Sequence, residues 1–361
     1  MILKTFAEAI DESNKFSKRH LILGNGFSIS CCENIFQYQS LYNEADFSKV
    51  KNVKEIFKAL NTNDFEFVIK SLNEAAKISK IYSEENLIDM LSEKLNKDAE
   101  SLKQILVSTI AKNHPVNPSA ISNEKFWSCR DFLSHFIGDK KGNIYTLNYD
   151  LLLYWTLMHD DRPFEDELQL EKNDGFGNAD DGFDDDYVVW QGESAPHSPN
   201  IHFLHGALHL FDSGSQIKKF TWSRKNESLI NQITESVNKN IFPIFVAEGS
   251  SDQKKTKIRH NAYLYQGLKQ FVNNAKTIKT CFFILGHSLD DNDDHVFLEL
   301  GRSGRCQKIY IGMIGDVESV DNKRIIKKAE QIASLRSNNY PLELDYYDAK
   351  TANIWGDYDK I

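Results

Sequence analysis

Residues that could bind an anion follow the first short apolar run of this 361-residue chain. The run at 20–23 ends in Gly24-Asn25-Gly26-Phe27-Ser28. Glycines allow the backbone to approach a phosphate closely, and amides at the start of a helix point toward it. The third glycine of a dinucleotide fingerprint is missing, because Ile29 stands in its place. A simple tight turn is an equally good interpretation of this segment.

Two further apolar runs end in residues suited to acid–base chemistry. Asn148 and Asp150 follow the run at 143–147, where they could contact a ligand or cap a helix, and capping is favoured for either residue alone. His205 follows the run at 201–204, where a lone histidine is more often structural. His202 and His209 lie nearby, but residues 202 and 205 face opposite sides of a strand, so we expect no metal site.

A fourth polar cluster follows the run at 280–285. It begins with Gly286-His287-Ser288 and continues through Asp290 into an acidic stretch. Carboxylates and hydroxyls of this kind hydrogen-bond to sugar hydroxyls in dinucleotide sites. A metal site and a helix N-terminus rich in Asp are the alternatives. Each of the four clusters alone has a structural explanation, but four at one edge of a sheet predict a shared pocket.

The elements that position these clusters are predicted from apolar runs and helical periodicity. Runs that are apolar throughout are typical of a parallel sheet covered on both faces, and helical stretches separate them. We therefore predict an α/β fold with a Rossmann-like, mostly parallel sheet. The predicted strands are 20–23, 143–147, 201–204, 242–246, 280–285, 308–312 and 343–347.

Residues of about 40–136 show helical periodicity and predict a large helical insertion after the first strand, within a single domain of residues 1–361. Asn63 and Glu66 have the spacing of a capping box. Phe67, Leu72 and Ala75 are then expected on roughly one face of the helix. A second unusual region, about 165–195, is predicted to be an acidic loop, since 174–186 holds six Asp and three Gly. Its spacing does not fit a calcium-binding loop.

Composition excludes several classes of protein. The net charge of −9 argues against direct nucleic-acid binding. The five cysteines form no Cys-x-x-Cys pair, which argues against a disulfide framework or a cysteine zinc ribbon. The first twenty residues lack a signal-peptide core, and the longest apolar run, 151–158, is too short to span a membrane. We expect a cytoplasmic protein with no membrane association.

Taken in order, the four clusters resemble the motifs of the sirtuin-like superfamily over about residues 20–315. Gly24-Asn25-Gly26-Phe27-Ser28 is similar to its Gly-Ala-Gly-x-Ser phosphate turn, with Asn in place of Ala. Thr146-Leu147-Asn148-Tyr149-Asp150 resembles Thr-Gln-Asn-x-Asp, and His205-Gly206 resembles the catalytic His-Gly. Gly286-His287-Ser288 is similar to the late Gly-Thr-Ser turn near the cofactor ribose.

Within that superfamily, the chain departs from protein deacylases, which typically carry a four-cysteine zinc ribbon after the His-Gly motif. Only Cys281 and Cys306 follow His205 here. The chain is more similar to a group of bacterial sirtuin-like proteins. The shared features are Leu-Gly-Asn-Gly-Phe-Ser at 23–28, Asp64-Phe65-Glu66, the Asp-Gly-Phe at 174–176 before Trp190, and 246–250. Related bacterial domains are NAD hydrolases that deplete NAD in antiphage defence.

The resemblance implies that NAD is the substrate and that no metal is needed. Its pyrophosphate would bind at Gly24, Asn25, Gly26, Phe27 and Ser28, and its ribose near Gly286, Ser288 and Asp290. Asn148 would orient water or ribose hydroxyls, His205 would be the general base, and Asp150 would orient either partner. An NAD-dependent deacylase and a non-catalytic NAD or ADP-ribose sensor that regulates a partner are the alternatives. A homo-oligomer is expected, with an ATPase or another defence protein as activating partner and the helices of 40–136 as the contact surface.

Overall fold

Six parallel strands form the central sheet of the computed structural model, which describes residues 2–32, 38–48, 50–82, 85–138, 141–159, 170–177, 187–192, 197–221, 228–239, 241–246, 250–302, 304–336 and 339–356. The strands are β1 (Lys18–Leu23), β2 (Ile144–Thr146), β5 (Ile201–Phe203), β8 (Thr280–Leu285), β9 (Lys308–Met313) and β10 (Glu343–Asp348). Their order across the sheet is β10-β9-β8-β1-β2-β5. Numbered along the chain this is the 3-2-1-4-5-6 order of a Rossmann fold, which confirms the predicted fold class.

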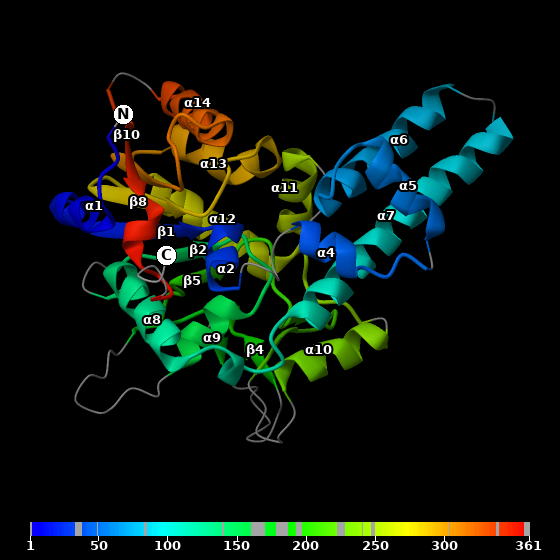
Figure 1. The fold of residues 1–361 in the computed structure, drawn as a ribbon, viewed down its shortest axis with the longest axis horizontal. Helices are drawn as coiled ribbons and strands as arrows, with labels where there is room; N and C mark the ends of the chain where they lie inside the picture. Colours follow the sequence, from blue (N-terminus) through cyan, green and yellow to red (C-terminus); the bar gives the residue numbers. More distant parts are fainter. Residues whose placement is uncertain are drawn as a thin grey trace.

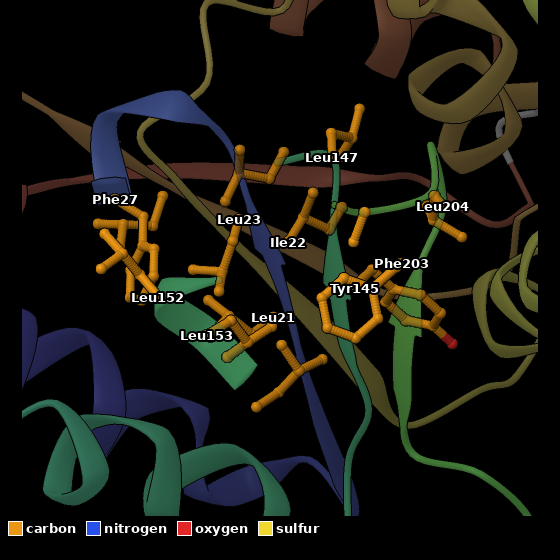
Figure 2. Close-up of a cluster of buried hydrophobic side chains, with 14 of the residues drawn as sticks. Leu21, Ile22, Leu23, Phe27, Tyr145, Leu147, Leu152, Leu153, Phe203 and Leu204 are labelled. Atoms are coloured by element: carbon orange, nitrogen blue, oxygen red, sulfur yellow. The ribbon is translucent and has the colours of Figure 1, made fainter. Parts of the chain in front are cut away.

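Helices cover both faces of this sheet (Figure 1). On one face lie α8 (Asn123–Ile137) and α9 (Leu152–Met158), and on the other lie α12 (Ala262–Ala275), α13 (Asp294–Arg302) and α14 (Val320–Ser334). Strand residues alternate between the faces. Leu21 and Leu23 point toward Leu152 and Leu153 of α9 (Figure 2).

The other face of the sheet is built around Tyr145, whose ring centroid is 5.0 Å from that of Phe271 in α12. All these core side chains are buried. Both faces therefore exclude water, as the uninterrupted apolar runs indicated.

The chain between β1 and β2 is helical wherever it is described as regular structure. It comprises α2 (Asn25–Cys31), α4 (Tyr38–Glu44), α5 (Lys51–Ala59), α6 (Phe65–Tyr82), α7 (Glu85–Asn113), the 3-10 turn η2 (Pro118–Ala120) and α8. Helices α6 and α7 form a long antiparallel hairpin that projects away from the sheet (Figure 1).

The start of α6 carries a side-chain cap, since the backbone N–H of Phe67 donates to the side chain of Asp64 at 3.1 Å. The predicted capping box pairs Asn63 with Glu66, whose side chain lies outside the described part of the chain. Phe67 and Ala75 are exposed, whereas Val68, Leu72 and Ala76 are buried. The prediction is confirmed for Leu72, whereas the buried face runs through Val68 and Ala76 instead of Phe67 and Ala75.

A second, antiparallel sheet was not predicted. It consists of β3 (Phe176–Gly177), β4 (Tyr187–Trp190), β7 (Ile217–Phe220) and β6 (Leu210–Asp212), in that order. Two of these strands flank residues 178–186, so most of the predicted acidic loop lies outside the described residues. Asp174, at its start, pairs with the buried Lys219 at 2.5 Å.

The predicted strand 242–246 is not part of either sheet. Its contacts are the N–H of Ile244 with the carbonyl of Leu210 and the N–H of Val246 with the carbonyl of His205. Pro243 has no N–H to donate, and the segment forms only an isolated bridge between Phe245 and Gly206.

The described residues also include the helices α1 (Phe6–Glu12), α10 (Leu229–Asn238) and α11 (Ser251–His260) and the 3-10 turn η5 (Asp291–Asp293). Helix α1 is continued by η1 (Ser13–Lys15), and β10 is followed by η6 (Ala349–Ala352). All five cysteines are free thiols. Within the described part of the chain, no helix is both long and apolar enough to cross a membrane.

Candidate active site

A cavity of about 590 Å³ lies at the carboxyl-terminal edge of the parallel sheet. It spans the neighbouring strands β1 and β8, where the strand order reverses, which is where ligands bind in open α/β sheets. Its volume is in the range of small-molecule sites. Nine of the eleven candidate residues line it: Gly24, Asn25, Gly26, Asn148, Asp150, His205, Gly286, Ser288 and Asp290.

The turns after β1 and β8 pack directly against each other in the wall of this cavity. The N–H of Gly26 donates to the carbonyl of Gly286 at 2.8 Å. A Cβ at position 26 would lie 2.6 Å from the Cα of Gly286, so no larger residue fits without a backbone shift. The close approach of the two turns is therefore sufficient to explain these glycines.

The two candidate residues that do not line the cavity lie beneath it. Phe27 is buried against Trp355, whose indole N–H donates to the carbonyl of Phe27. Ser28 is fully buried, and its Oγ donates to Asp150 Oδ2 at 2.5 Å. Phe27 and Ser28, which were predicted to bind a cofactor with the rest of the turn, do not line the cavity; their side chains anchor α2 below the glycine turn.

Asn148 and Asp150 connect the end of β2 to that turn. Asn148 Nδ2 donates to the carbonyl of Gly24 and to Ser28 Oγ, both at 3.0 Å. Its amide nitrogen is thus occupied, and the amide oxygen is the group that can accept a hydrogen bond from a ligand. Asp150 also accepts from the N–H of Leu152 at 2.9 Å, so it caps the start of α9 as well. Burial raises the pKa of Asp150 above its usual value, against the effect of these hydrogen bonds.

His205 is almost fully buried but lines the cavity. Burial lowers its pKa well below the usual value, and Lys254 and two other histidines act in the same direction, opposed by Asp293. The imidazole is therefore neutral near pH 7 and able to accept a proton. Gly206, directly after it, has a φ of 85° and would clash with the carbonyl of Ile244 if it carried a Cβ.

Behind His205 lies a group of polar side chains in which Lys254 and His295 were not sequence candidates, whereas His287 and Asp293 belong to the cluster that follows β8. His205 Nε2 is 3.0 Å from His295 Nε2 and 3.8 Å from Asp293 Oδ1. Asp293 also pairs with the buried Lys254 at 3.0 Å and with His287 at 3.1 Å. Burial alone would raise the pKa of Asp293, but Lys254 and the histidines outweigh it and hold this pKa well below the usual range.

Three of these side chains, His205, Asp293 and His295, are close enough together to hold a metal ion. Imidazole nitrogens and a carboxylate suit zinc. However, the Lys254 ammonium lies 3.0 Å from the same Asp293 oxygen that faces His205. The carboxylate charge is thus already balanced, so the donor set favours a hydrogen-bonded network over a cation site.

The outer rim of the cavity is polar. Ser288 Oγ donates to Asp290 Oδ2 at 2.8 Å, and Arg324 of α14 donates to Asp290 Oδ1 at 3.3 Å. Asp290 is about half exposed, so it can exchange these partners for ligand hydroxyls. Asp321 and Asn322 also line this end. The sequence analysis did not identify Asp321, Asn322 and Arg324 of α14 as site residues. An acidic and an amide side chain at the start of a helix could have indicated them.

The helical insertion supplies the opposite wall of the cavity. Leu41, Asp64, Leu106 and Ile110 line it. Lys70 of α6 donates to Asn292, next to the network residue Asp293. The insertion therefore forms part of the cavity wall, a role that the sequence analysis did not assign to it.

Chemically, the cavity combines an apolar wall, two glycine turns, an amide oxygen, a neutral buried imidazole and several carboxylates. Such a set can hold a polar small molecule and accept a proton from it or from water. The site lies at the switch point of the sheet of a Rossmann-like α/β protein.

The chain belongs to the family described as "Domain of unknown function (DUF4917)", whose family model matches residues 21–355. The match covers every strand end that borders the cavity. No curated protein is detectably similar to the sequence.

Proposed function

We propose that the cavity binds NAD and that the protein hydrolyses the bond between nicotinamide and ribose. The observation that carries this proposal is that four polar strand ends, in the order found in the sirtuin-like superfamily, line a single cavity of about 590 Å³. The cavity lies at the point of the sheet where dinucleotides bind in Rossmann folds. The resemblance in sequence and the position of the cavity are independent of each other.

In this proposal the pyrophosphate lies at the glycine turn, where Gly24, Asn25 and Gly26 line the cavity, and a ribose lies at Ser288 and Asp290. The N–H groups of Gly24 and Gly26 already donate to the carbonyls of Leu285 and Gly286, so these two glycines shape the turn and do not donate to the phosphate. The Asn148 amide oxygen accepts a hydrogen bond from water or from a ribose hydroxyl. Asp150 acts indirectly in this proposal. Its carboxyl accepts from Ser28 Oγ and from the N–H of Leu152, so it positions Ser28, which in turn accepts from Asn148.

The reaction is balanced as NAD and water giving nicotinamide, ADP-ribose and a proton. The carbon–nitrogen bond of the positively charged nicotinamide breaks, and its electron pair leaves with the ring. The ribose carbon becomes oxocarbenium-like and is attacked by water, and neutral His205 takes the proton. The carboxylate of Asp290, on the rim of the cavity, favours the developing positive charge on the sugar.

The test is incubation of the purified full chain with NAD, alone and with the products of neighbouring genes, followed by chromatographic separation of the products. We expect nicotinamide and ADP-ribose in equal amounts. His205→Ala and Asn148→Ala should each lower the rate by about 10²–10⁴-fold. The control variant is His209→Gln, because His209 is buried and does not line the cavity. Its rate of NAD hydrolysis should stay within about threefold of the wild-type rate.

Three results would overturn the proposal. Full activity in both variants would remove His205 and Asn148 from the reaction. Nicotinamide release only in the presence of an acyl-lysine peptide would indicate a deacylase. Binding of NAD or ADP-ribose by calorimetry, with no turnover under any of these conditions, would indicate a sensor.

A further inference from the structure

The His205–His295 contact requires one of the two rings to donate. Their Nε2 atoms are 3.0 Å apart, and the ring planes are tilted by 23°. Both side chains are buried and both have pKa values below the usual range, so both are neutral near pH 7. In a neutral pair, one Nε2 must carry a proton and the other must present a lone pair. The tautomer of one histidine therefore determines the tautomer of the other.

The nitrogen that faces a ligand follows from this pairing. Because Nε2 of His205 is occupied by His295, Nδ1 is the ring nitrogen left to accept a proton in the cavity. Nδ1 can accept only if the proton of neutral His205 sits on Nε2. In that state His205 donates to His295, and His295 carries its own proton on Nδ1. Ser251 Oγ lies 3.4 Å from that nitrogen and can accept this proton.

The carboxylate of Asp293 lies beside the His205–His295 pair. Its Oδ1 is 3.8 Å from His205 Nε2, and its Oδ2 is 3.1 Å from His287 Nε2. The backbone N–H of Leu289 donates to His287 Nδ1, so a neutral His287 must carry its proton on Nε2 and donate it to Asp293. With Lys254 on the other oxygen, the carboxylate is fixed by two donors from different elements.

We propose that His295 is a positioning residue that selects the base-competent tautomer of His205, and that Asp293 stabilises the imidazolium formed when His205 takes a proton. This inference rests on the proposed role of His205 in NAD hydrolysis. The arrangement performs the task that a buried carboxylate performs for the histidine of a catalytic triad, with His295 as the direct hydrogen-bond partner. Neither residue touches the substrate.

The proton balance fits the geometry. Water loses a proton to His205 Nδ1, and the resulting imidazolium keeps its Nε2 proton shared with His295. One positive charge then lies 3.8 Å from Asp293. The groups that face His205 are Asp293, Lys254, His295 and His287; the carboxylate favours the charged ring, and the other three disfavour it.

The first measurement reads the tautomer directly. In ¹⁵N-histidine-labelled wild-type protein near pH 7, we expect the ¹⁵N chemical shifts of His205 to show a proton on Nε2 and a lone pair on Nδ1. A proton on Nδ1 would overturn the inference. Since no NAD is present, this outcome is distinguishable from a failure of NAD hydrolysis, which the product assay reports.

The second measurement uses two variants of His295. His295→Gln keeps a carbonyl acceptor near the Nε2 position, whereas His295→Ala removes it. We expect His295→Ala to lower kcat by about 10²–10⁴-fold with KM little changed, and His295→Gln to recover at least about tenfold of that loss. Equal loss in the two variants, or a loss confined to KM, would contradict a positioning role.

A third measurement tests the charge. Asp293→Asn should lower kcat and move the acidic limb of the pH–rate profile to lower pH, because the imidazolium loses its counter-charge. An unmoved limb would contradict the role of Asp293. Metal analysis tests the alternative of a zinc site at His205, Asp293 and His295. One zinc ion per chain in the wild type, absent from His295→Ala, would overturn the hydrogen-bonded histidine pair in favour of a metal centre.

Discussion

Asn148 Nδ2 lies 3.0 Å from Ser28 Oγ, which connects the end of β2 to the first turn of α2. Ser28 Oγ in turn donates to Asp150 Oδ2 at 2.5 Å. The glycine turn and the Asn/Asp segment, which are separated by about 120 residues in the chain, are thus one hydrogen-bonded unit. Its members are buried, so each bond in it affects stability as well as the shape of the cavity.

Removal of the Ser28 hydroxyl should therefore destabilise the protein. Ser28→Ala leaves Asp150 Oδ2 without the Ser28 donor, although Oδ1 keeps the N–H of Leu152, and we expect the free energy of unfolding to fall by about 1–3 kcal/mol. Ser30→Ala is the matched control in the same helix, because Ser30 Oγ makes only a local bond to the carbonyl of Phe27. The free energy of unfolding of both variants is measured in urea. Equal values for Ser28→Ala and Ser30→Ala would contradict a stabilising role of the hydrogen bonds between Asn148, Ser28 and Asp150.

Two glycine substitutions should have opposite effects. Gly26→Ala places a Cβ 2.6 Å from the Cα of Gly286, and we expect a loss of about 1–3 kcal/mol. Gly267→Ala lies within α12, where the nearest atom would be 3.5 Å away, so helix propensity should make it neutral or stabilising by up to about 1 kcal/mol. Thermal unfolding compares the two; a Gly26→Ala variant as stable as the wild type would show that the two turns can separate.

Breaking the buried ion pair behind His205 should be costly. Lys254 is 1% exposed in its side chain, so Lys254→Met leaves Asp293 uncompensated, with an expected loss of about 3–5 kcal/mol. The double variant with Asp293→Asn should recover part of it. Lys255→Met is the control: its pair with Glu299 is more exposed and should contribute at most about 1 kcal/mol. Equal losses for the two lysines would argue against a buried charge network.

The protein should lose stability steeply in mild acid. Burial is the main cause that lowers the pKa of seven histidines. The pKa falls to about 3 for His20 and His202, to about 4 for His114 and His295, and well below the usual value for His205 and His209; that of His135 is also lowered. Below pH 6.5 the unfolded chain binds protons that the folded chain does not. Stability is therefore retained above pH 6.5 and falls as the pH drops toward 4, by up to about 1.4 kcal/mol per pH unit for each histidine.

One variant isolates a single histidine in that pH dependence. His20→Asn keeps an acceptor for the N–H of Asn143, which now donates to His20 Nδ1, but does not titrate. Urea unfolding at pH 7, 6 and 5 should show a slope reduced by about one proton relative to the wild type. An unchanged slope would show that His20 is protonated in the folded state.

Much of the fold was predictable because its signals are local. Strands buried on both faces leave uninterrupted apolar runs, and β1 and β8 match their predicted positions closely. The strands of the second sheet are only two to four residues long, and β3 and β4 are half-buried, so they leave no such runs. At residues 242–246 a strand was predicted where the structure has none. This apolar run contains a proline and packs in the core without pairing as a strand.

The sequence by itself determined which polar residues end the parallel strands, since motif order and apolar runs are properties of the chain. It could not determine what lies behind His205. Lys254, Asp293 and His295 come from α11, η5 (Asp291–Asp293) and α13, and their meeting depends on how those helices pack against the sheet. Only the tertiary structure decided that Asn148 and Asp150 hold the glycine turn together, because hydrogen bonds across 120 residues leave no periodic trace in the sequence.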